Sequence, residues 1–556
     1  MISIDQVETR DELADLLHIR HNLLTYVLYI AKPDSYYQTF YIPKKNGESR
    51  EIQAPRRELK RIQKRLALEL SVYQQSMYKT FDINTNIAHA FRKGRSIITN
   101  AKIHKNKRYI VNIDLKDFFH SIHFGRVKGF FEKNTFYQLP STIATIIAQL
   151  TCYNGRLPQG APSSPVITNL ICQVLDYHVL RIAKKYRLDY TRYADDMTFS
   201  TNMTEFWNER ETFLSDLTRE IDRNGFRIND AKTRFIKRES KQTVTGLTVN
   251  KKINADRIYY KETRAMADRL YKTGSFNING KPGTISMLEG RFSFIDQITK
   301  FNNKKDGKTH DIRTLCARER DYQKFLFYKY FYANERPLII TEGKTDIIYI
   351  KSALKKLYDV YPQLIKKNSD GSFCYKISFF HRTPRMKYFF NISMDGADTI
   401  TKIHLFYSGN NKMPNYYQEL STNQKMKNAV IFLFDNETKS DRPLKKFIGY
   451  CKLDDAQKEE LQEQCFTRLI DGSELYLATV PLVEGDDESE IEDLFPKAVK
   501  DIRIEGKMFY RKNDFNPKIH YGKEVFSKYI YNNYDAIDFS GFIPLLDAIV
   551  KAIKTK

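Results

Sequence analysis

The chain has 556 residues, with 91 Lys and Arg residues against 67 Asp and Glu residues, which gives a formal net charge of +24. This length exceeds what one compact core normally holds, so we expect about three or four structural units. The basic excess, together with 13% aromatic residues, indicates that the partner is a polyanion with bases on which rings can stack, namely nucleic acid.

The sequence also disfavours several other classes of protein. No apolar run approaches the roughly 18 residues that a membrane-spanning helix needs. The first residues, MISIDQVETRDEL, lack the basic-then-apolar order of a signal peptide. The six cysteines show no paired metal-ligand spacing, so we expect reduced thiols in a reducing compartment. We therefore expect a soluble, cytoplasmic protein without a membrane partner.

The first chemical candidates along the chain are basic. The segment IPKKNGESREI contains Lys44, Lys45 and Arg50, which are candidates to bind a triphosphate. The cluster HAFRKGRS at residues 89–96 adds further cations. A predicted strand, YIVNID, then ends at Asp114, and Phe119 follows five positions later. A ring at Phe119 could lie under the sugar of a nucleotide and exclude a 2′-hydroxyl, whereas plain core packing is the alternative for Phe118 and Phe119.

The segment LPQGAPSSPVITNL at residues 157–170 predicts a shaped loop followed by a helix, which Ser163 or Ser164 can cap. Backbone without bulky side chains at Gly160 and Ala161 can approach a base pair closely, and Gln159 would then contact the nucleotide or the template.

Two adjacent acids, Asp195 and Asp196, lie at the predicted tip of a tight β-hairpin in TRYADDMTFS. Side-by-side carboxylates repel each other unless a cation lies between them, and paired divalent metals are a common device for displacement at phosphorus. With Asp114 alongside, three carboxylates would surround two Mg²⁺ ions. Lys232, in NDAKTR, is a candidate proton donor to the leaving pyrophosphate.

The ordered set of basic fingers segment, Asp114 strand, PQGAPSSP, YADD and lysine segment resembles a reverse transcriptase over roughly residues 20–330. NAKIH at residues 100–104 and VTG at 244–246 resemble the NAxxH and VTG signatures of retron reverse transcriptases. The resemblance implies an RNA-directed DNA polymerase that uses deoxynucleoside triphosphates to copy a structured noncoding RNA. It would prime from a guanosine 2′-hydroxyl and leave a branched RNA-linked single-stranded DNA, called msDNA.

The resemblance also places nucleic-acid contacts. The basic, helical segment at residues 257–272 is expected to be a thumb that follows an A-form duplex, which proteins read by shape and by phosphate and 2′-hydroxyl contacts. Recognition of the RNA is expected at this surface and at the signature residues Asn100, His104, Val244, Thr245 and Gly246.

A second group of acids follows residue 335. RPLIITEGKTD predicts a buried strand that delivers Glu342 at its carboxyl end, and AVIFLFDNE repeats the pattern with Asp435 and Glu437. In extended backbone a spacing of two would direct both carboxylates to one side. Together these resemble a TOPRIM domain that binds one or two Mg²⁺ ions, with Glu437 in place of the second Asp. In the acidic run EGDDESEIED, Glu492 or Asp493 could complete the cluster.

We therefore predict an α+β right-hand polymerase followed by an α/β TOPRIM domain, with fingers and palm at 1–250, a thumb at 251–332 and a TOPRIM-like nuclease at 333–556. The predicted role is defence against phage, in which the RNA and its msDNA product restrain the nuclease, a toxin, until infection. Such restraint is compatible with a homo-oligomer. Two alternatives stay open: an RNA-binding scaffold that regulates the nuclease, and a group II intron-like maturase.

Overall fold

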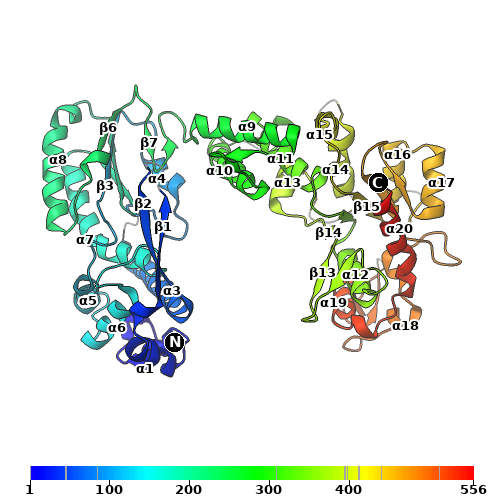
Figure 1. The fold of residues 1–556 in the computed structure, drawn as a ribbon, viewed down its shortest axis with the longest axis horizontal. Helices are drawn as coiled ribbons and strands as arrows, with labels where there is room; N and C mark the ends of the chain where they lie inside the picture. The colour runs from blue at the N-terminus through cyan, green and yellow to red at the C-terminus, as the bar shows by residue number, and fades with distance from the viewer. Residues whose placement is uncertain are drawn as a thin grey trace. The chain divides into compact units, whose positions relative to one another are not determined.

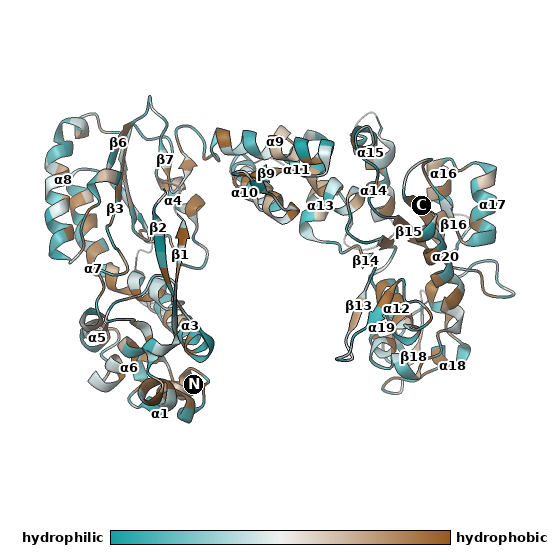
Figure 2. Ribbon diagram, viewed as in Figure 1, coloured by the Kyte–Doolittle hydropathy of each residue, from teal (hydrophilic) through white to brown (hydrophobic). Residues whose placement is uncertain are grey.

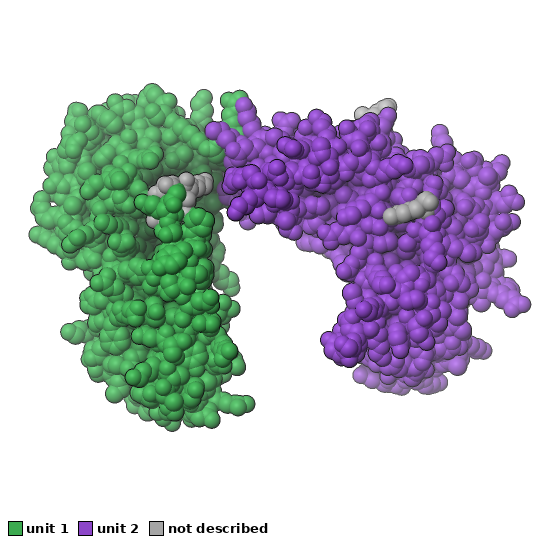
Figure 3. Space-filling view, in the orientation of Figure 1, with its two compact units in different colours: residues 1–257 green, residues 258–556 purple. Residues whose placement is uncertain are grey.

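A computed structural model describes residues 2–43, 47–83, 86–307, 310–393, 396, 398–410, 413–439, 441–511 and 514–555. The chain divides into two compact units, Met1–Arg257 (unit 1) and Ile258–Lys556 (unit 2), which are coloured separately in Figure 3. Each unit is described by itself.

Unit 1 is built around a four-stranded antiparallel sheet in the order β4-β5-β3-β6. Strands β3 and β6 of this sheet are labelled in Figure 1. A separate hairpin pairs β1 with β2, and a short one pairs β7 with β8. The strands are β1 (Tyr37–Pro43), β2 (Ser49–Pro55), β3 (Tyr109–Asp114), β4 (Asp189–Tyr193), β5 (Asp196–Thr201), β6 (Arg234–Lys237), β7 (Thr243–Val244) and β8 (Leu247–Thr248). The helices are α1 (Arg10–Leu16), α2 (His21–Thr25), α3 (Arg57–Thr80), α4 (Ile97–Ile103), α5 (Phe124–Lys133), α6 (Ser141–Thr151), α7 (Ser164–Lys185) and α8 (Phe206–Arg223).

The core of unit 1 explains why these segments fold as they do. Val111 and Ile113 of β3 and Met197 and Phe199 of β5 alternate along their strands and enter one core, as the period of two in a strand requires. The neighbouring Ile110, Thr198 and Ser200 are buried as well, so both faces of these strands are covered. Helix α7 contains an 18-residue window with a mean hydropathy of 1.2, so by length and composition it could cross a membrane, contrary to the sequence expectation. Since 61% of that window is buried inside the protein, α7 has the properties of a core helix.

Unit 2 contains a five-stranded mixed sheet in the order β14-β11-β15-β17-β16, in which β14, β11, β15 and β17 run parallel and β16 is antiparallel. These strands are β11 (Leu338–Thr341), β14 (Ser378–Phe379), β15 (Val430–Phe434), β16 (Phe466–Arg468) and β17 (Leu475–Thr479). Short pairs are formed by β9 (Asn277–Ile278), β10 (Lys281–Pro282), β12 (Ile365–Lys367), β13 (Phe373–Tyr375), β18 (Met508–Phe509) and β19 (His520–Tyr521). The helices are α9 (Arg257–Thr273), α10 (Ile285–Lys305), α11 (Ala317–Phe327), α12 (Lys344–Lys356), α13 (Pro384–Phe390), α14 (Asp398–Ser408), α15 (Tyr416–Ser421), α16 (Pro443–Cys451), α17 (Asp455–Gln464), α18 (Lys497–Lys500), α19 (Lys523–Asn532) and α20 (Ile543–Lys554).

Successive residues of the central strands enter two different cores. In β15, Ile431 belongs to the core that contains α12, α19 and α20, whereas Phe432 belongs to the core that contains α9 to α11, α13 and α14. The strand is therefore covered on both faces, which accounts for its uninterrupted apolar sequence and its hydrophobic colour in Figure 2. Helices α9 to α11, from the predicted thumb segment, share a core with this sheet. The division into fingers and palm, thumb and nuclease domain stays a prediction.

Candidate functional site

The acidic pair lies in a two-residue turn between β4 and β5. Tyr193 pairs with Asp196 in register, which leaves Ala194 and Asp195 as the loop residues. Ala194 has a φ of 59°, a left-handed conformation that is usual for Gly and strained for Ala. This tight turn presents Asp195 and Asp196 together at the end of the hairpin.

Asp114 lies directly beside this pair, because it faces Asp196 in the β3–β5 register. The backbone N–H of Leu115 also donates to the carbonyl of Asp195 at 3.1 Å. Burial raises the pKa of Asp195, and the charge of Asp114 adds to the shift. Burial and the neighbouring Asp195 and Asp114 charges raise the pKa of Asp196 to about 6. Three carboxylates that repel one another create a site that favours a cation.

Lys232 and Asn229 hold Asp114 in place. The Lys232 ammonium donates to both carboxylate oxygens of Asp114 at 3.0 Å, and the Asn229 amide donates to Oδ1 at 3.0 Å. The hydrogen bond to Asp114 raises the pKa of Lys232, so it carries its proton at neutral pH. Within the described ranges, no three His, Cys, Asp or Glu side chains stand in metal-binding geometry. The carboxylate oxygens of Asp114, Asp195 and Asp196 nevertheless form the hard donor set that suits Mg²⁺.

The predicted nucleotide-binding residues have different surroundings. Phe118 is buried and packs on Phe226, whereas Phe119 is only half-buried, so Phe119 is the ring of the pair that can reach a ligand. Arg50 is exposed on β2, and its charge lowers the pKa of Asp195, which places it near the acids. Lys44 and Lys45 lie outside the described residues.

The loop at Gln159 and Gly160 packs against β2. The Gln159 carbonyl accepts from the Gln53 backbone N–H at 2.9 Å. Gly160 has a φ of 133°, and a Cβ there would lie 2.8 Å from Ile52 Cγ2 and 2.9 Å from the Gln53 carbonyl oxygen. The close approach that requires glycine is therefore to β2, whereas the sequence argument invoked a base pair. A nucleotide contact by the Gln159 side chain stays a prediction.

Arg192, which sequence reasoning missed, anchors the hairpin from inside. Its guanidinium is fully buried and makes two 2.8 Å hydrogen bonds to Asp176 of α7. Nη1 of Arg192 also donates to the Ala194 carbonyl at 3.1 Å, and Tyr190 donates to Asp176 at 2.9 Å. The position of Arg192 two residues before the turn was visible in the sequence, but its partner on α7 was not.

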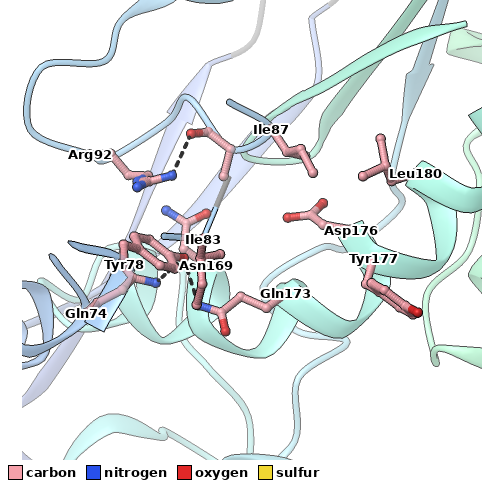
Figure 4. Close-up of a pocket in the computed structure, with 11 residues that line it drawn as sticks. Gln74, Tyr78, Ile83, Ile87, Arg92, Asn169, Gln173, Asp176, Tyr177 and Leu180 are labelled. Carbon is pink, nitrogen blue, oxygen red and sulfur yellow. Dashed lines mark hydrogen bonds between the residues drawn. The ribbon is translucent and has the colours of Figure 1, made fainter. Parts of the chain in front are cut away.

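A cavity of about 310 Å³ borders this network (Figure 4). Asp176 and Asn169 line it from α7, and Tyr78 lines it from α3. The Tyr78 hydroxyl accepts from the amides of Gln74 and Gln173 at 2.9 and 2.8 Å. The cavity therefore borders residues that fix the hairpin, and its lining does not include Asp114, Asp195 or Asp196.

Asn100, Ala101 and His104 of NAKIH lie in the protein interior, whereas Lys102 is exposed. His104 is fully buried, and its ring nitrogens lie 2.8 Å from Ser200 Oγ on β5 and 2.7 Å from Thr191 Oγ1 on β4. Burial lowers its pKa to about 3, so the ring is neutral. Asn100 is also fully buried, and Val244 is buried in β7. These three residues are buried in this structure, and nucleic-acid binding by them stays a prediction.

The remaining VTG residues are closer to the surface. Thr245 is half-buried and Gly246 is exposed, in the turn between β7 and β8. Gly246 has a φ of 81°, which accounts for glycine at this turn. Nucleic-acid binding by Thr245 and Gly246 stays a prediction.

In unit 2, Glu342 and Asp435 meet at the carboxyl ends of the adjacent parallel strands β11 and β15. The backbone N–H of Asp435 donates to Glu342 Oε1 at 3.1 Å, and Asp435 Oδ1 accepts from the Ile491 N–H at 2.9 Å. Burial raises the pKa of Glu342 to about 7 and raises that of Asp435 well above its ordinary value. Nearby acids add to both shifts, so this pair also favours a cation.

Glu492 joins this group and Asp493 does not. Glu492 is fully buried and accepts from Lys523 Nζ at 3.0 Å, and burial raises its pKa to about 7. Asp493 instead pairs with Arg511 at 2.6 Å and accepts from the Glu490 backbone N–H at 3.0 Å. Of the two candidates, Glu492 therefore lies with the acids.

Glu437 lies beyond the end of β15. Its N–H bonds back to the Asp435 carbonyl at 3.1 Å, so the segment turns rather than extends, contrary to the extended-backbone argument. Its carboxylate pairs with Arg442 at 3.1 Å. Its pKa is raised by burial, and its charge contributes to the raised pKa of Glu342, so it remains near the group.

Sequence reasoning missed two members of this second group. Asp346, in the first turn of α12, accepts from the Gly343 N–H at 2.7 Å, and burial raises its pKa. Its position four residues after Glu342 in EGKTD was a usable signal. Lys523, at the start of α19, contacts Glu490 and Glu492 at 3.0 Å. Nothing near Lys523 in the sequence indicated this role.

Comparison with known proteins agrees with the geometry in unit 1. Residues 42–249 match the family model described as reverse transcriptase (RNA-dependent DNA polymerase). Retron Ec86 reverse transcriptase of Escherichia coli is 34% identical over 310 residues, which cover 55% of this chain and 88% of that protein. The chain belongs to the retron reverse transcriptase family.

Other matches are more partial. Retron Mx162 reverse transcriptase of Myxococcus xanthus is 32% identical over 323 residues, and the match covers 52% of this chain but 64% of that relative's length. Among solved structures, a Candida albicans telomerase complexed with a telomeric RNA fragment covers 53% of this chain and 60% of that chain. Its identity of 12% and TM-score of 0.32 are too low to support an argument.

Proposed function

We propose that unit 1 is an RNA-directed DNA polymerase that copies a structured noncoding RNA and leaves msDNA, a branched RNA-linked single-stranded DNA. Family membership supports the polymerase class. The single observation that carries the site assignment is the register that places Asp114 beside Asp195 and Asp196. The priming group in this proposal is a guanosine 2′-hydroxyl of the bound RNA.

In this proposal the three aspartates hold two Mg²⁺ ions, which when bound activate the attacking hydroxyl and neutralise the leaving pyrophosphate. The residues of the chain supply the rest. Arg50 would bind the triphosphate, and Phe119 would contact the sugar and exclude a 2′-hydroxyl. Lys232, protonated against Asp114, would give its proton to pyrophosphate as it leaves.

The test is the nucleic acid that copurifies with the full-length protein. We expect a short DNA that survives RNase, disappears with DNase, and shifts in mobility after RNase because a branched RNA has been removed. An RNA without attached DNA would contradict the polymerase proposal and favour the RNA-binding scaffold. RNA splicing by the protein would favour the maturase alternative.

We also propose that residues 333–556 form a TOPRIM-like metal-dependent nuclease that acts as the effector in defence against phage. The convergence of Glu342, Asp435 and Glu492 near the ends of parallel strands supports this reading. In the proposal these acids, with Glu437, would hold one or two Mg²⁺ ions. The substrate of the nuclease in this proposal is a nucleic acid. The RNA with its msDNA would restrain the nuclease in the cytoplasm. If this restraint acts between copies of the chain, the complex is a homo-oligomer.

Expression of the full-length protein with and without its RNA tests the effector. We expect toxicity when the msDNA is absent, and no toxicity from the Glu342→Gln variant under the same conditions. Unchanged toxicity in Glu342→Gln would contradict the nuclease proposal while leaving the polymerase proposal intact.

A further inference from the structure

A groove with basic and apolar walls lies in the N-terminal part of unit 1 and is lined by residues of α2, the turn of π-helix at Tyr26–Ile30 and α3. It has a volume of about 1110 Å³. Arg20, Tyr26 and Ile30 line one side, and Glu58 and Arg61 line the side formed by α3. These residues play no part in the site of the three aspartates.

Helix α3 extends the basic wall. Lys60 and Lys64 are one helical turn apart, and Arg61 adjoins them, so the three cations share one side of the helix. All three are exposed, as is Arg20. In the part of the chain that the structure describes, none of these four cations forms an ion pair, and the acid that lines the groove is Glu58.

The basic residues of α7 and α8 provide a contrast within the same unit. Lys185 and Arg219 pair with Asp216 at 2.6 and 3.4 Å, and Arg223 pairs with Glu220 at 3.8 Å. The charges of α8 are therefore balanced by protein acids, whereas those of α3 are left for an external anion. Closely spaced unpaired cations are the usual footprint of a phosphate backbone.

Large apolar side chains are exposed beside these cations. Tyr26 is 47% exposed and Ile30 is 70% exposed at the groove, and Leu68 and Val72 continue the exposed stripe of α3 beyond Lys64. A duplex offers these side chains little apolar surface to contact, because its bases are stacked inside the helix. A single strand offers unstacked bases that pack on rings and apolar groups while its phosphates meet the cations.

We propose that this groove and the adjoining face of α3 bind a single-stranded segment of RNA. The choice of RNA over DNA rests on the proposed function, in which the template is RNA. Lys60, Arg61, Lys64 and Arg20 contact phosphates, and Tyr26 stacks on a base. Together these residues form a holding site for unpaired template outside the catalytic centre.

Equilibrium binding of full-length protein to an oligouridine of about 20 nucleotides, titrated between about 50 and 200 mM salt, tests the phosphate contacts. Affinity falls as salt rises, and the triple variant Lys60→Gln, Arg61→Gln, Lys64→Gln is expected to make this dependence shallower. The magnitude of the slope of log affinity against log salt should decrease by about 2. The matched control, Lys185→Gln, Arg219→Gln, Arg223→Gln, removes the same formal charge and is expected to change the slope little. Equal slope changes in both variants would overturn the proposal, because net charge alone would then explain binding.

Tyr26→Ala tests base stacking separately, since it changes no charge. Affinity for oligouridine is expected to fall about fivefold or more with the salt slope unchanged, and affinity for duplex RNA is expected to stay constant. Equal effects on both RNAs, or no effect on oligouridine, would overturn the single-strand assignment. Thermal midpoints of all variants check folding.

A polymerase assay separates this proposal from the function on which it rests. The α3 triple variant is expected to retain extension on a pre-annealed primer and RNA template that leaves only a few unpaired template nucleotides to copy, and to lose extension progressively as this single-stranded overhang is lengthened. Absence of extension by the wild-type protein, with the binding differences intact, would contradict the polymerase proposal and leave the binding groove standing.

Discussion

The two acidic groups of this protein are built in different ways. In unit 1, antiparallel register places Asp114 opposite Asp196, exposed Lys232 bonds to Asp114, and the charge of Arg50 lowers the pKa of Asp195. In unit 2, Glu342 and Asp435 end parallel strands, and their group lies deeper, with Lys523 bonded to buried Glu492. The β4–β5 hairpin brings Asp195 and Asp196 together locally, and Asp114 reaches them from β3. Glu342, Asp435 and Glu492 come from three separate segments, so the second group depends on more long connections.

The largest effect should come from removing one acid at each site. Asp195→Asn is expected to reduce DNA synthesis on the order of a thousandfold, because a bound metal contributes several kcal/mol of charge stabilisation. Glu342→Gln is expected to leave synthesis at the wild-type rate and to abolish toxicity. Primer extension and a growth assay measure the two outcomes. If Glu342→Gln reduced synthesis as much as Asp195→Asn, the comparison of two independent sites would fail.

The buried support of the first site gives the next largest effect. Asp176→Asn leaves the Arg192 guanidinium buried without its charged partner, and such a loss typically costs about 3 to 5 kcal/mol of unfolding free energy. Denaturant unfolding measures this cost.

A double variant distinguishes stability from positioning. Arg192→Met with Asp176→Leu removes both charges and is expected to recover most of the stability. DNA synthesis should stay low, because the Ala194 carbonyl has lost the donor that fixes the turn. Full recovery of synthesis would show that Arg192 stabilises the fold without positioning the acids.

Prediction from the sequence reached the parts of each site that are local. Asp195 and Asp196 are adjacent in the chain, and Asp114 ends a recognisable strand, so antiparallel pairing alone was enough to suggest their meeting. The strand-end positions of Glu342 and Asp435 were equally readable. Arg192 and Lys523 were missed because their partners lie on α7 and in the segment of Glu492, and only tertiary packing brings them together.

The same limit applies to the NAKIH motif. A motif identifies residues that matter, but it does not say whether they face solvent or the interior. His104 links β4 to β5 through two buried hydroxyls, and this burial could not be read from the spacing of Asn100 and His104.

His104→Ala is therefore expected to destabilise the hairpin by about 2 to 3 kcal/mol, since it leaves Thr191 and Ser200 with unpaired buried hydroxyls. His104→Gln, which can still bond one hydroxyl, should recover part of this loss. Denaturant unfolding measures stability, and RNA binding by the folded fraction should equal that of the wild type. Weakened RNA binding at unchanged stability would support the prediction of a direct contact instead.

The smallest effect should be the pH dependence of the second site without metal. Folding raises the pKa of Glu342 to about 7 from an ordinary value of 4.5, and that of Glu492 likewise. The folded state then binds more protons than the unfolded state between these values, so stability is fully present below about pH 4.5 and falls as pH rises through 7. We expect the free energy of unfolding to fall between pH 5 and pH 8, and to fall less in Glu342→Gln.

Mg²⁺ should oppose this loss, because it binds the ionised carboxylates and therefore the folded state at high pH. The thermal midpoint of the full-length protein, measured with Mg²⁺ and with a chelator, is expected to differ more at pH 8 than at pH 6. The variants Asp195→Asn and Glu342→Gln show which site causes this difference. The pH dependence of the Mg²⁺-induced shift in thermal midpoint should persist in Asp195→Asn and shrink in Glu342→Gln. Its loss in Asp195→Asn alone would place the titrating metal site in unit 1, and the contrast between a shallow and a deep acidic group would be wrong.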